Sequence, residues 1–210
     1  MLLHKETVTP TLLNLVKQIF TLKGMESFRL VGGTGLSLQL GHRKSVDIDL
    51  FSNEKVDKTY LRKNLARLFP EVEVVVTEDS LTAEIDQVRV DIYDDWMIPF
   101  RQAPVIAEGI AMASLRDIAA LKLSSITGRR EKKDYIDLYF LFEQLGAQNV
   151  LTEFKEYDPH LSTKSILFAL TEVDTARNNK SPMPDLILPV DWSLISNSMK
   201  QAAKEYVASL

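Results

Sequence analysis

The sequence has 210 residues, of which 45% are hydrophobic and 26% charged, and its formal net charge is −4. This length allows one large domain or two small ones, and the negative charge argues against non-specific coating of nucleic acid while leaving room for one basic site. The lack of cysteine excludes disulfides, thiolate metal sites and cysteine nucleophiles. Because no apolar run approaches the ~20 residues of a membrane span, we expect a cytoplasmic protein without membrane contact.

The first part of the chain mixes helix and strand patterns. Apolar residues at helical spacing predict a helix over residues 11–20, and a short apolar run predicts a strand over 28–31. Gly32 and Gly33 interrupt this run. A short helix is then expected over 34–40, with Gly41 as its stop.

A strand after this helix carries two aspartates. Asp47 and Asp49 are two positions apart, so their side chains share one face, while Val46, Ile48 and Leu50 are expected to face a core. Neighbouring carboxylates repel each other unless a cation binds them, and carboxylate oxygens suit Mg²⁺ or Mn²⁺. An Asp-x-Asp alone is more often a pair of solvated acids. The preceding Gly-Gly-Thr favours a metal site.

That Gly-Gly-Thr turn has the features of a phosphate cradle. Glycines at positions 32 and 33 let the backbone approach a triphosphate, a helix start favours negative charge, and the Thr34 hydroxyl can donate to a phosphate oxygen. A simple strand-to-helix turn with a threonine cap is the alternative. The two aspartates that follow favour the phosphate interpretation.

The next segments are a predicted helix over 53–69 and strands over 71–77 and 82–94. In the last of these strands Asp91 points away from the apolar face formed by Val88, Val90 and Ile92. If this strand lies near the first two, Asp91 comes beside the other two aspartates. A short edge strand is expected over 105–112.

Beyond residue 112 the patterns predict helices only. They cover residues 114–126, 131–145, 163–178 and 192–208, and a proline-rich loop spans 180–189. We therefore expect an α+β fold with a mixed sheet flanked by helices. Its α/β domain would span residues 1–112, and a helical domain over 113–210 would complete the active-site cleft.

Five cations fall within twelve positions of the helical part, and could grip phosphates: Lys122, Arg129, Arg130, Lys132 and Lys133. Lys122 is unusual because its helix is otherwise apolar. Asp134 and Asp137 are three apart on one helix face, and Asp134 is either a general base or a residue that orients a cation. For Arg129, Arg130 and Lys132 a solvated, salt-bridged helix start is the simpler interpretation.

Two stretches together resemble the polymerase-β-like nucleotidyltransferase superfamily, and more closely the AbiEii/AbiGii-type nucleotidyltransferase toxins of type IV toxin–antitoxin and abortive-infection systems. The first is GGTGLSLQLGHRKSVDIDLF at residues 32–51, and the second is KLSSITGRREKKDYIDLYFL at residues 122–141. The resemblance covers roughly residues 28–145. It implies transfer of a nucleoside monophosphate from an NTP to an acceptor, most readily a tRNA or other RNA 3′ end, with Mg²⁺ or Mn²⁺ as cofactor and an antitoxin as partner.

The resemblance also implies roles for single residues. Asp47 and Asp49 would hold the metal, Asp91 would supply the third carboxylate of the superfamily, and Lys122 and Asp134 would act in NTP binding and catalysis. The residues that would hold the NTP are Gly32, Gly33, Thr34, Arg43, Ser45, Lys122 and Lys133, the last standing where arginine is commoner in the family. Either Asp91 or Asp134 would activate the acceptor. A non-catalytic nucleotide-binding or regulatory module and a metal-dependent phosphohydrolase or nuclease remain as alternatives.

Overall fold

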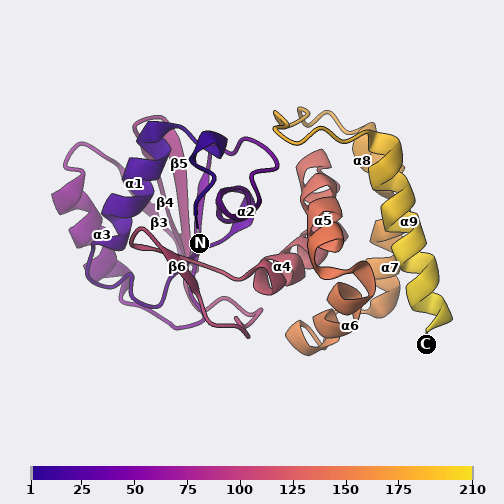
Figure 1. Cartoon of the computed structure of the whole chain (residues 1–210). Helices are drawn as coiled ribbons and strands as arrows, with labels where there is room; N and C mark the ends of the chain where they lie inside the picture. Colours follow the sequence, from indigo (N-terminus) through magenta and orange to yellow (C-terminus); the bar gives the residue numbers. More distant parts are fainter. Residues whose placement is uncertain (1, 210) are drawn as a thin grey trace. The chain divides into compact units, whose positions relative to one another are not determined.

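The computed structural model describes residues 2–209, and its contacts divide the chain into two compact units (Figure 1). The first unit ends at Ser114 and combines a sheet with helices, and the second begins at Leu115 and contains helices. The mixed α/β class with a helical C-terminal region is therefore confirmed.

The first unit is built on one seven-stranded sheet of order β3-β4-β5-β2-β1-β7-β6. The pairs β2–β5 and β1–β7 are parallel and the other neighbours are antiparallel, so the sheet is mixed. The strands are β1 (Arg29–Leu30), β2 (Ile48–Phe51), β3 (Val74–Val76), β4 (Ser80–Ile85), β5 (Val88–Tyr93), β6 (Val105–Ala107) and β7 (Ile110–Met112).

Helices cover one face of this sheet. Apolar side chains of α1 and α3 share a buried core with Ile48 and Leu50 of β2 and with Val90 and Ile92 of β5. Alternation along these strands sends the intervening side chains to the opposite face. The first unit contains η1 (Lys5–Thr7), α1 (Pro10–Phe20), α2 (Gly32–Leu40) and α3 (Lys58–Leu68). Val46 does not reach the core as expected: it precedes β2 and is 65% exposed.

Two segments predicted as single strands are hairpins. Residues 82–94 form β4 and β5, joined by Asp86 and Gln87 with φ of 51° and 64°. Residues 105–112 form β6 and β7, joined at Glu108 and Gly109 with φ of 50° and 82°. Two consecutive residues with positive φ produce the tight reversal of a two-residue hairpin. The Asp86–Gln87 pair lacks the glycine that usually marks such a turn. The sequence pattern therefore predicted one continuous strand over residues 82–94.

The helix expected from residue 53 begins five residues later, at Lys58. The side chain of Asp57 accepts a hydrogen bond from the Tyr60 amide and so caps α3. The residues before it serve as anchors instead. The Asn53 side-chain amide donates to the Trp96 carbonyl at 2.7 Å, and its oxygen accepts from the Phe100 amide at 2.7 Å.

The second unit consists of α4 (Leu115–Gly128), α5 (Lys132–Leu145), α6 (Ala147–Tyr157), α7 (Thr163–Thr171), α8 (Val173–Arg177) and α9 (Trp192–Ala208). The predicted helix over 163–178 is thus two helices, and α6 was not predicted. Tyr135 of α5 is fully buried and donates to the Ala169 carbonyl of α7 at 2.8 Å, and burial raises its pKa to about 12.

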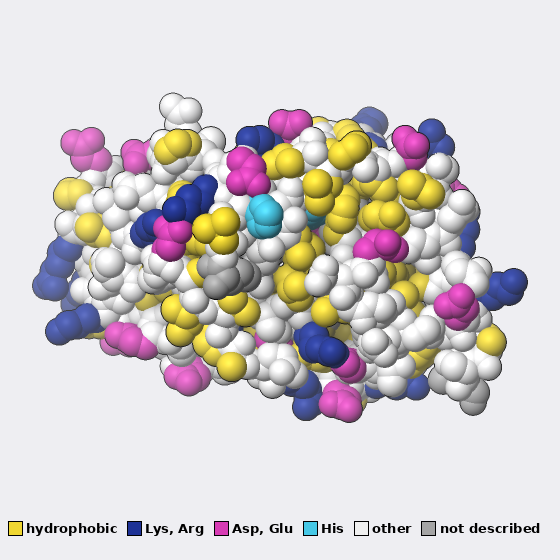
Figure 2. All heavy atoms as spheres, viewed as in Figure 1, with side chains coloured by type: hydrophobic (Ala, Val, Ile, Leu, Met, Phe, Trp, Pro, Cys, Tyr) yellow, Lys and Arg dark blue, Asp and Glu magenta, His cyan; other side chains and the backbone are white. Residues whose placement is uncertain are grey.

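The exposed face in Figure 2 shows acidic and basic side chains interspersed rather than gathered in one large patch. This pattern accords with the small net charge of −4. None of the helices in the described part of the chain is long and apolar enough to cross a membrane.

Candidate active site

The parallel pairing of β2 with β5 sets Asp49 directly opposite Asp91. Residues opposite each other on neighbouring strands project from the same face, so both carboxylates lie on the face that α1 and α3 leave uncovered. Asp47 comes just before β2, two positions from Asp49. Asp47 and Asp49 are half-buried and Asp91 is buried. The structure therefore places Asp49 and Asp91 side by side on one face of the sheet, with Asp47 two positions before Asp49 in the chain.

The Asp91 carboxylate accepts hydrogen bonds from two residues of its own hairpin. Thr82 of β4 donates its hydroxyl to Asp91 Oδ1 at 2.8 Å, and Arg89 Nε donates to Oδ2 at 2.6 Å. The Arg89 side chain is 63% exposed, and its hydrogen bond and ion pair with Asp91 raise the pKa of the guanidinium. No role was predicted for Arg89 from the sequence. The signal was present, because Arg89 and Asp91 alternate with the apolar residues of the same strand.

A hard divalent cation binds oxygen ligands, which Asp47, Asp49 and Asp91 could supply. Among residues 2–209, no three His, Cys, Asp or Glu side chains are grouped closely enough to hold a metal ion. Asp47 and Asp49 nevertheless supply the oxygen donors that Mg²⁺ or Mn²⁺ prefers, and Asp91 already attracts a cation, the Arg89 guanidinium. The oxygen donors of Asp47 and Asp49 therefore fit a divalent ion, whereas the Asp91 carboxylate is paired with Arg89 in this structure.

The two glycines at the start of α2 are required by close approaches. Gly32 has a φ of +64°, and a β-carbon there would lie 2.2 Å from Asp49 Oδ2. At Gly33 a β-carbon would lie 2.3 Å from Arg43 Nη2 and 3.0 Å from Ser45 Oγ. Only glycine lets the Asp49 carboxylate and the Arg43 guanidinium lie against this helix start.

The start of α2 has the electrostatics of an anion site. Within the described residues, no side chain caps this helix, whose first position follows Val31. Its first-turn amides carry partial positive charge, and the buried Arg43 adds a full one beside Gly33. The Gly32–Gly33 turn and Arg43 can therefore accept a phosphate group chemically.

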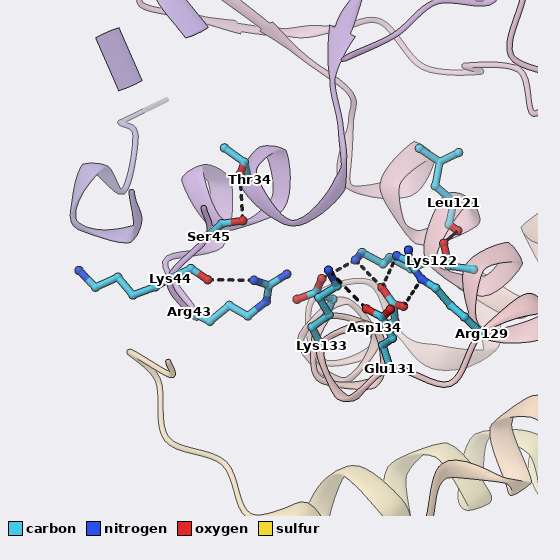
Figure 3. Close-up of polar contacts among 12 residues, drawn as sticks. Thr34, Arg43, Lys44, Ser45, Leu121, Lys122, Arg129, Glu131, Lys133 and Asp134 are labelled. Atoms are coloured by element: carbon cyan, nitrogen blue, oxygen red, sulfur yellow. Dashed lines mark hydrogen bonds and ion pairs between the residues drawn. The ribbon is translucent and has the colours of Figure 1, made fainter. Parts of the chain in front are cut away.

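Thr34 and Ser45 form a buried interlock. The Thr34 hydroxyl is hydrogen-bonded to the Ser45 hydroxyl at 2.9 Å and to the Asp47 carbonyl oxygen (Figure 3). Thr34 is fully buried and Ser45 nearly so. These contacts fasten α2 to the segment that carries the aspartates. The two hydroxyls thus position the turn, and the contact of Thr34 with phosphate stays a prediction.

In the second unit, Lys122 of α4 lies between two buried carboxylates of α5. Its Nζ is 2.8 Å from Asp134 Oδ1 (Figure 3). The same Nζ is 2.6 Å from Asp137 Oδ2. Arg129 Nε donates to Asp134 Oδ2 at 2.9 Å. Lys122, Asp134 and Asp137 are buried, whereas about half of the Arg129 side chain is exposed. This buried network joins α4 to α5.

The network determines the protonation of Asp134. Burial alone raises the pKa of its carboxyl, but the charges and hydrogen bonds of Lys122 and Arg129 outweigh burial and hold the pKa below its ordinary value. Both carboxylate oxygens accept from these cations. A carboxylate in this state is a poor proton acceptor. Of the two roles that the sequence left open for Asp134, the geometry favours orientation of the two cations.

The other cations at the start of α5 have separate contacts. Lys132 Nζ donates to the carbonyl oxygens of Asn179 and Ser181, which ties the loop after α8 to α5. Arg130 lies over the Phe168 ring. Lys133, 40% exposed, pairs with Glu131 at 3.4 Å. Lys133 therefore keeps more freedom to move than Lys122.

The residues around Asp49 in the first unit and the Lys122 network in the second lie in a region that one protein-family model matches. The family model described as nucleotidyl transferase AbiEii toxin, type IV TA system, matches residues 15–208. The chain belongs to this family. It is accordingly a nucleotidyltransferase, and both sequence stretches quoted above fall within the matched region.

Individual proteins are similar to this chain in sequence or in fold. An uncharacterized protein of Aquifex aeolicus (strain VF5), aq_aa25, is 24% identical over 202 residues, which cover 91% of this chain and 94% of that protein. The crystal structure of JHP933 from Helicobacter pylori is similar with a TM-score of 0.58 and 16% identity, covering 97% of this chain and 94% of that one.

A second solved structure is ANT(2")-Ia in complex with adenylyl-2"-tobramycin. It is similar with a TM-score of 0.56 and 18% identity over 72% of this chain and 98% of that one. At these identities the likeness establishes the nucleotidyltransferase fold for this AbiEii-family chain.

Proposed function

We propose that this AbiEii-family nucleotidyltransferase is metal-dependent and transfers a nucleoside monophosphate from an NTP to an RNA 3′ end, as the toxin of a toxin–antitoxin pair. The observation that carries the proposal is the Gly32 turn packed directly against Asp49, with Asp91 in register beside it. The turn that would bind phosphate and the carboxylates that would bind metal are therefore adjacent. Nucleotidyl transfer needs both of them.

The NTP would bind with its triphosphate at the start of α2. The backbone of Gly32 and Gly33 and the guanidinium of Arg43 supply the positive potential there. Asp47 and Asp49 would hold Mg²⁺ or Mn²⁺. Such an ion, when bound, offsets the negative charge of the phosphate oxygens. Thr34 and Ser45 contribute by fixing the turn to the strand.

Asp91 is the better candidate for the base that receives the proton of the acceptor hydroxyl. Asp134 is locked between two cations with a lowered pKa. Asp91 lies on the same sheet face as Asp49 and is paired with one cation, Arg89, whose side chain is 63% exposed. In the reaction the acceptor oxygen forms a bond to the α-phosphorus, its proton passes to the carboxylate, and the bond to pyrophosphate breaks.

Two lysines of the second unit are candidates for NTP binding. Lys122 is ion-paired with the buried carboxylates of Asp134 and Asp137, and the side chain of Lys133 is 40% exposed. We propose that both lysines are required for NTP binding, with Asp134 as the residue that positions Lys122. Because Lys133 stands where the family more often has arginine, it supplies one point charge rather than a bidentate contact.

An RNA labelling assay tests the proposal. The protein is incubated with total RNA, Mg²⁺ or Mn²⁺ and each labelled NTP in turn, beside an Asp49→Asn variant. We expect label in RNA with the wild type, at least a hundredfold less with the variant, and none after chelation of the metal. Release of phosphate without incorporation would favour a phosphohydrolase instead. If neither RNA nor protein is labelled with any NTP, the proposal fails.

The toxin role has its own test. Expression of the wild type should arrest growth, and expression of the Asp49→Asn variant should not. A gene adjacent to that of this protein should encode an antitoxin that restores growth when expressed together with it. Equal growth with wild type and variant would remove the toxin role and leave the transferase proposal in place.

A further inference from the structure

A row of aromatic residues lies beside the carboxylates on the same face of the sheet. The register pairs Phe51 of β2 with Tyr93 of β5 and with Arg29 of β1. Phe51 and Tyr93 come two positions after Asp49 and Asp91. Because alternate residues share a face, the aromatic pair lies one step along the strands from the carboxylate pair, about 7 Å away.

Trp96 completes this aromatic cluster. Its ring lies 4.2 Å from the Phe51 ring at 37° and 5.6 Å from the Tyr93 ring at 68°, measured between centroids and planes. The Phe51 and Tyr93 rings meet edge to face at 5.3 Å. All three side chains are half-buried, and so present part of their surface to solvent.

The cluster is held rigidly. The Trp96 amide donates to the Ser52 carbonyl at 2.9 Å, and Asn53 donates to the Trp96 carbonyl at 2.7 Å. The apolar core lies on the opposite face, under α1 and α3, and includes none of these three rings. The three rings therefore form a partly exposed aromatic surface that does not belong to the apolar core.

One arginine lies beside this cluster in the sheet. Arg29 of β1 is paired in register with Phe51, and its guanidinium lies 4.4 Å from the centroid of a fourth aromatic ring, that of Phe100. Burial, and then the charges of Asp91 and Asp49, raise the pKa of Tyr93, so its ring stays neutral at physiological pH. Aromatic rings interleaved with arginines are the combination that binds single-stranded nucleic acid through base stacking and backbone charge.

We propose that Phe51, Tyr93 and Trp96 form a stacking platform for the terminal bases of the acceptor RNA. This proposal rests on the proposed function. In-line displacement places the acceptor and the leaving pyrophosphate on opposite sides of the α-phosphorus. The phosphate turn follows β1, whereas Tyr93 and Trp96 belong to β5 and the segment after it, on the other side of β2. The platform is therefore on the acceptor side of the carboxylates.

Tryptophan fluorescence tests the platform without reference to activity. The sequence has two tryptophans, Trp96 and Trp192, so a Trp192→Phe variant reports on Trp96 alone. We expect a short single-stranded RNA to quench this fluorescence and an NTP without RNA to leave it unchanged. If Trp192→Phe does not fold, the quench is measured on wild type and should vanish in Trp96→Leu. Absence of a quench by RNA, or an equal quench by NTP alone, would overturn the proposal.

Kinetics provide the second test. Trp96→Leu and Tyr93→Leu keep apolar bulk but lose the aromatic face, and should raise the KM for RNA about tenfold with little change in the KM for NTP. Tyr60→Leu is the matched control, because Tyr60 is an exposed tyrosine on α3, over the other face. If wild type labels RNA and the platform variants match the control, the platform fails and the transferase remains. If RNA quenches Trp96 but is never labelled, the transferase fails and the platform remains.

Discussion

The carboxylate of Asp49 occupies the space that a side chain at Gly32 would need: a β-carbon there would lie 2.2 Å from Asp49 Oδ2. The turn at the start of α2 and the aspartate of β2 are therefore parts of one constellation. A change at Gly32 acts on Asp49 directly.

Gly32→Ala tests this coupling. The new methyl group must displace the Asp49 carboxylate, and residue 32 must also keep a φ of +64°. We expect RNA labelling to fall at least a hundredfold and the free energy of unfolding to drop by about 1–3 kcal/mol. The labelling rate and urea denaturation measure the two effects.

Gly109→Ala is the control that separates the loss of RNA labelling from the loss of stability. Gly109 has a φ of +82°, but a β-carbon there meets nothing within 4 Å. This variant should lose about 1 kcal/mol of stability from backbone strain and keep its labelling activity. Equal activity in Gly32→Ala and Gly109→Ala would show that the approach of Asp49 to Gly32 is unimportant.

Removal of Arg89 should strengthen metal binding. Arg89 satisfies Asp91 through an ion pair, and a divalent ion that uses Asp91 must compete with it. In Arg89→Leu we expect Mn²⁺ to bind roughly three- to tenfold more tightly, as measured by calorimetry without nucleotide. Arg89→Lys keeps a cation and should resemble wild type. Unchanged Mn²⁺ affinity in Arg89→Leu would show that Asp91 takes no part in metal binding.

Lys122→Met should destabilise the second unit strongly. It leaves Asp137 and one oxygen of Asp134 buried without their main cation. The expected loss is about 3–5 kcal/mol in urea denaturation. Lys200→Met is the control, since Lys200 pairs with Asp174 on the surface, where such a pair contributes about 0–1 kcal/mol. Similar losses in both variants would contradict the buried network.

The pH dependence of stability should include a contribution from Asp134. Its folded pKa lies below the unfolded value of about 3.9. The contribution is therefore fully present above that pH and is lost as pH falls through the folded pKa. In Asp134→Asn the acid side of the stability curve should be flatter than in wild type, as measured by urea midpoints across the acid range. An unchanged slope would show that Lys122 and Arg129 do not stabilise the Asp134 carboxylate.

Much of the first unit follows from local sequence signals. Gly41 has a positive φ at the end of α2, as its position predicted, and the alternation in β2 and β5 put Asp49 and Asp91 on the face away from the core. That these strands are neighbours is a matter of topology, which no local pattern specifies. The Asp86–Gln87 turn was missed because two non-glycine residues adopt positive φ there.

The site was harder to predict where side chains act on one another. The alternation in β5 places Arg89 and Asp91 on one face, but whether the two side chains form an ion pair depends on their rotamers. The sequence predicts that Thr34 contacts phosphate, but it gives no sign that the Thr34 hydroxyl is hydrogen-bonded to the buried Ser45. The aromatic cluster depends on Trp96, which reaches Phe51 from a loop after β5, and no periodicity connects the two.

The most direct test of the central claim compares two labels on one nucleotide. NTP carrying label at the α-phosphate or at the γ-phosphate is incubated with RNA, Mg²⁺ and the protein. Nucleotidyl transfer predicts that the α-label enters RNA, that the γ-label leaves as pyrophosphate, and that Asp49→Asn does neither. Entry of the γ-label into the acceptor, or release of free phosphate with no α-label in RNA, would contradict it.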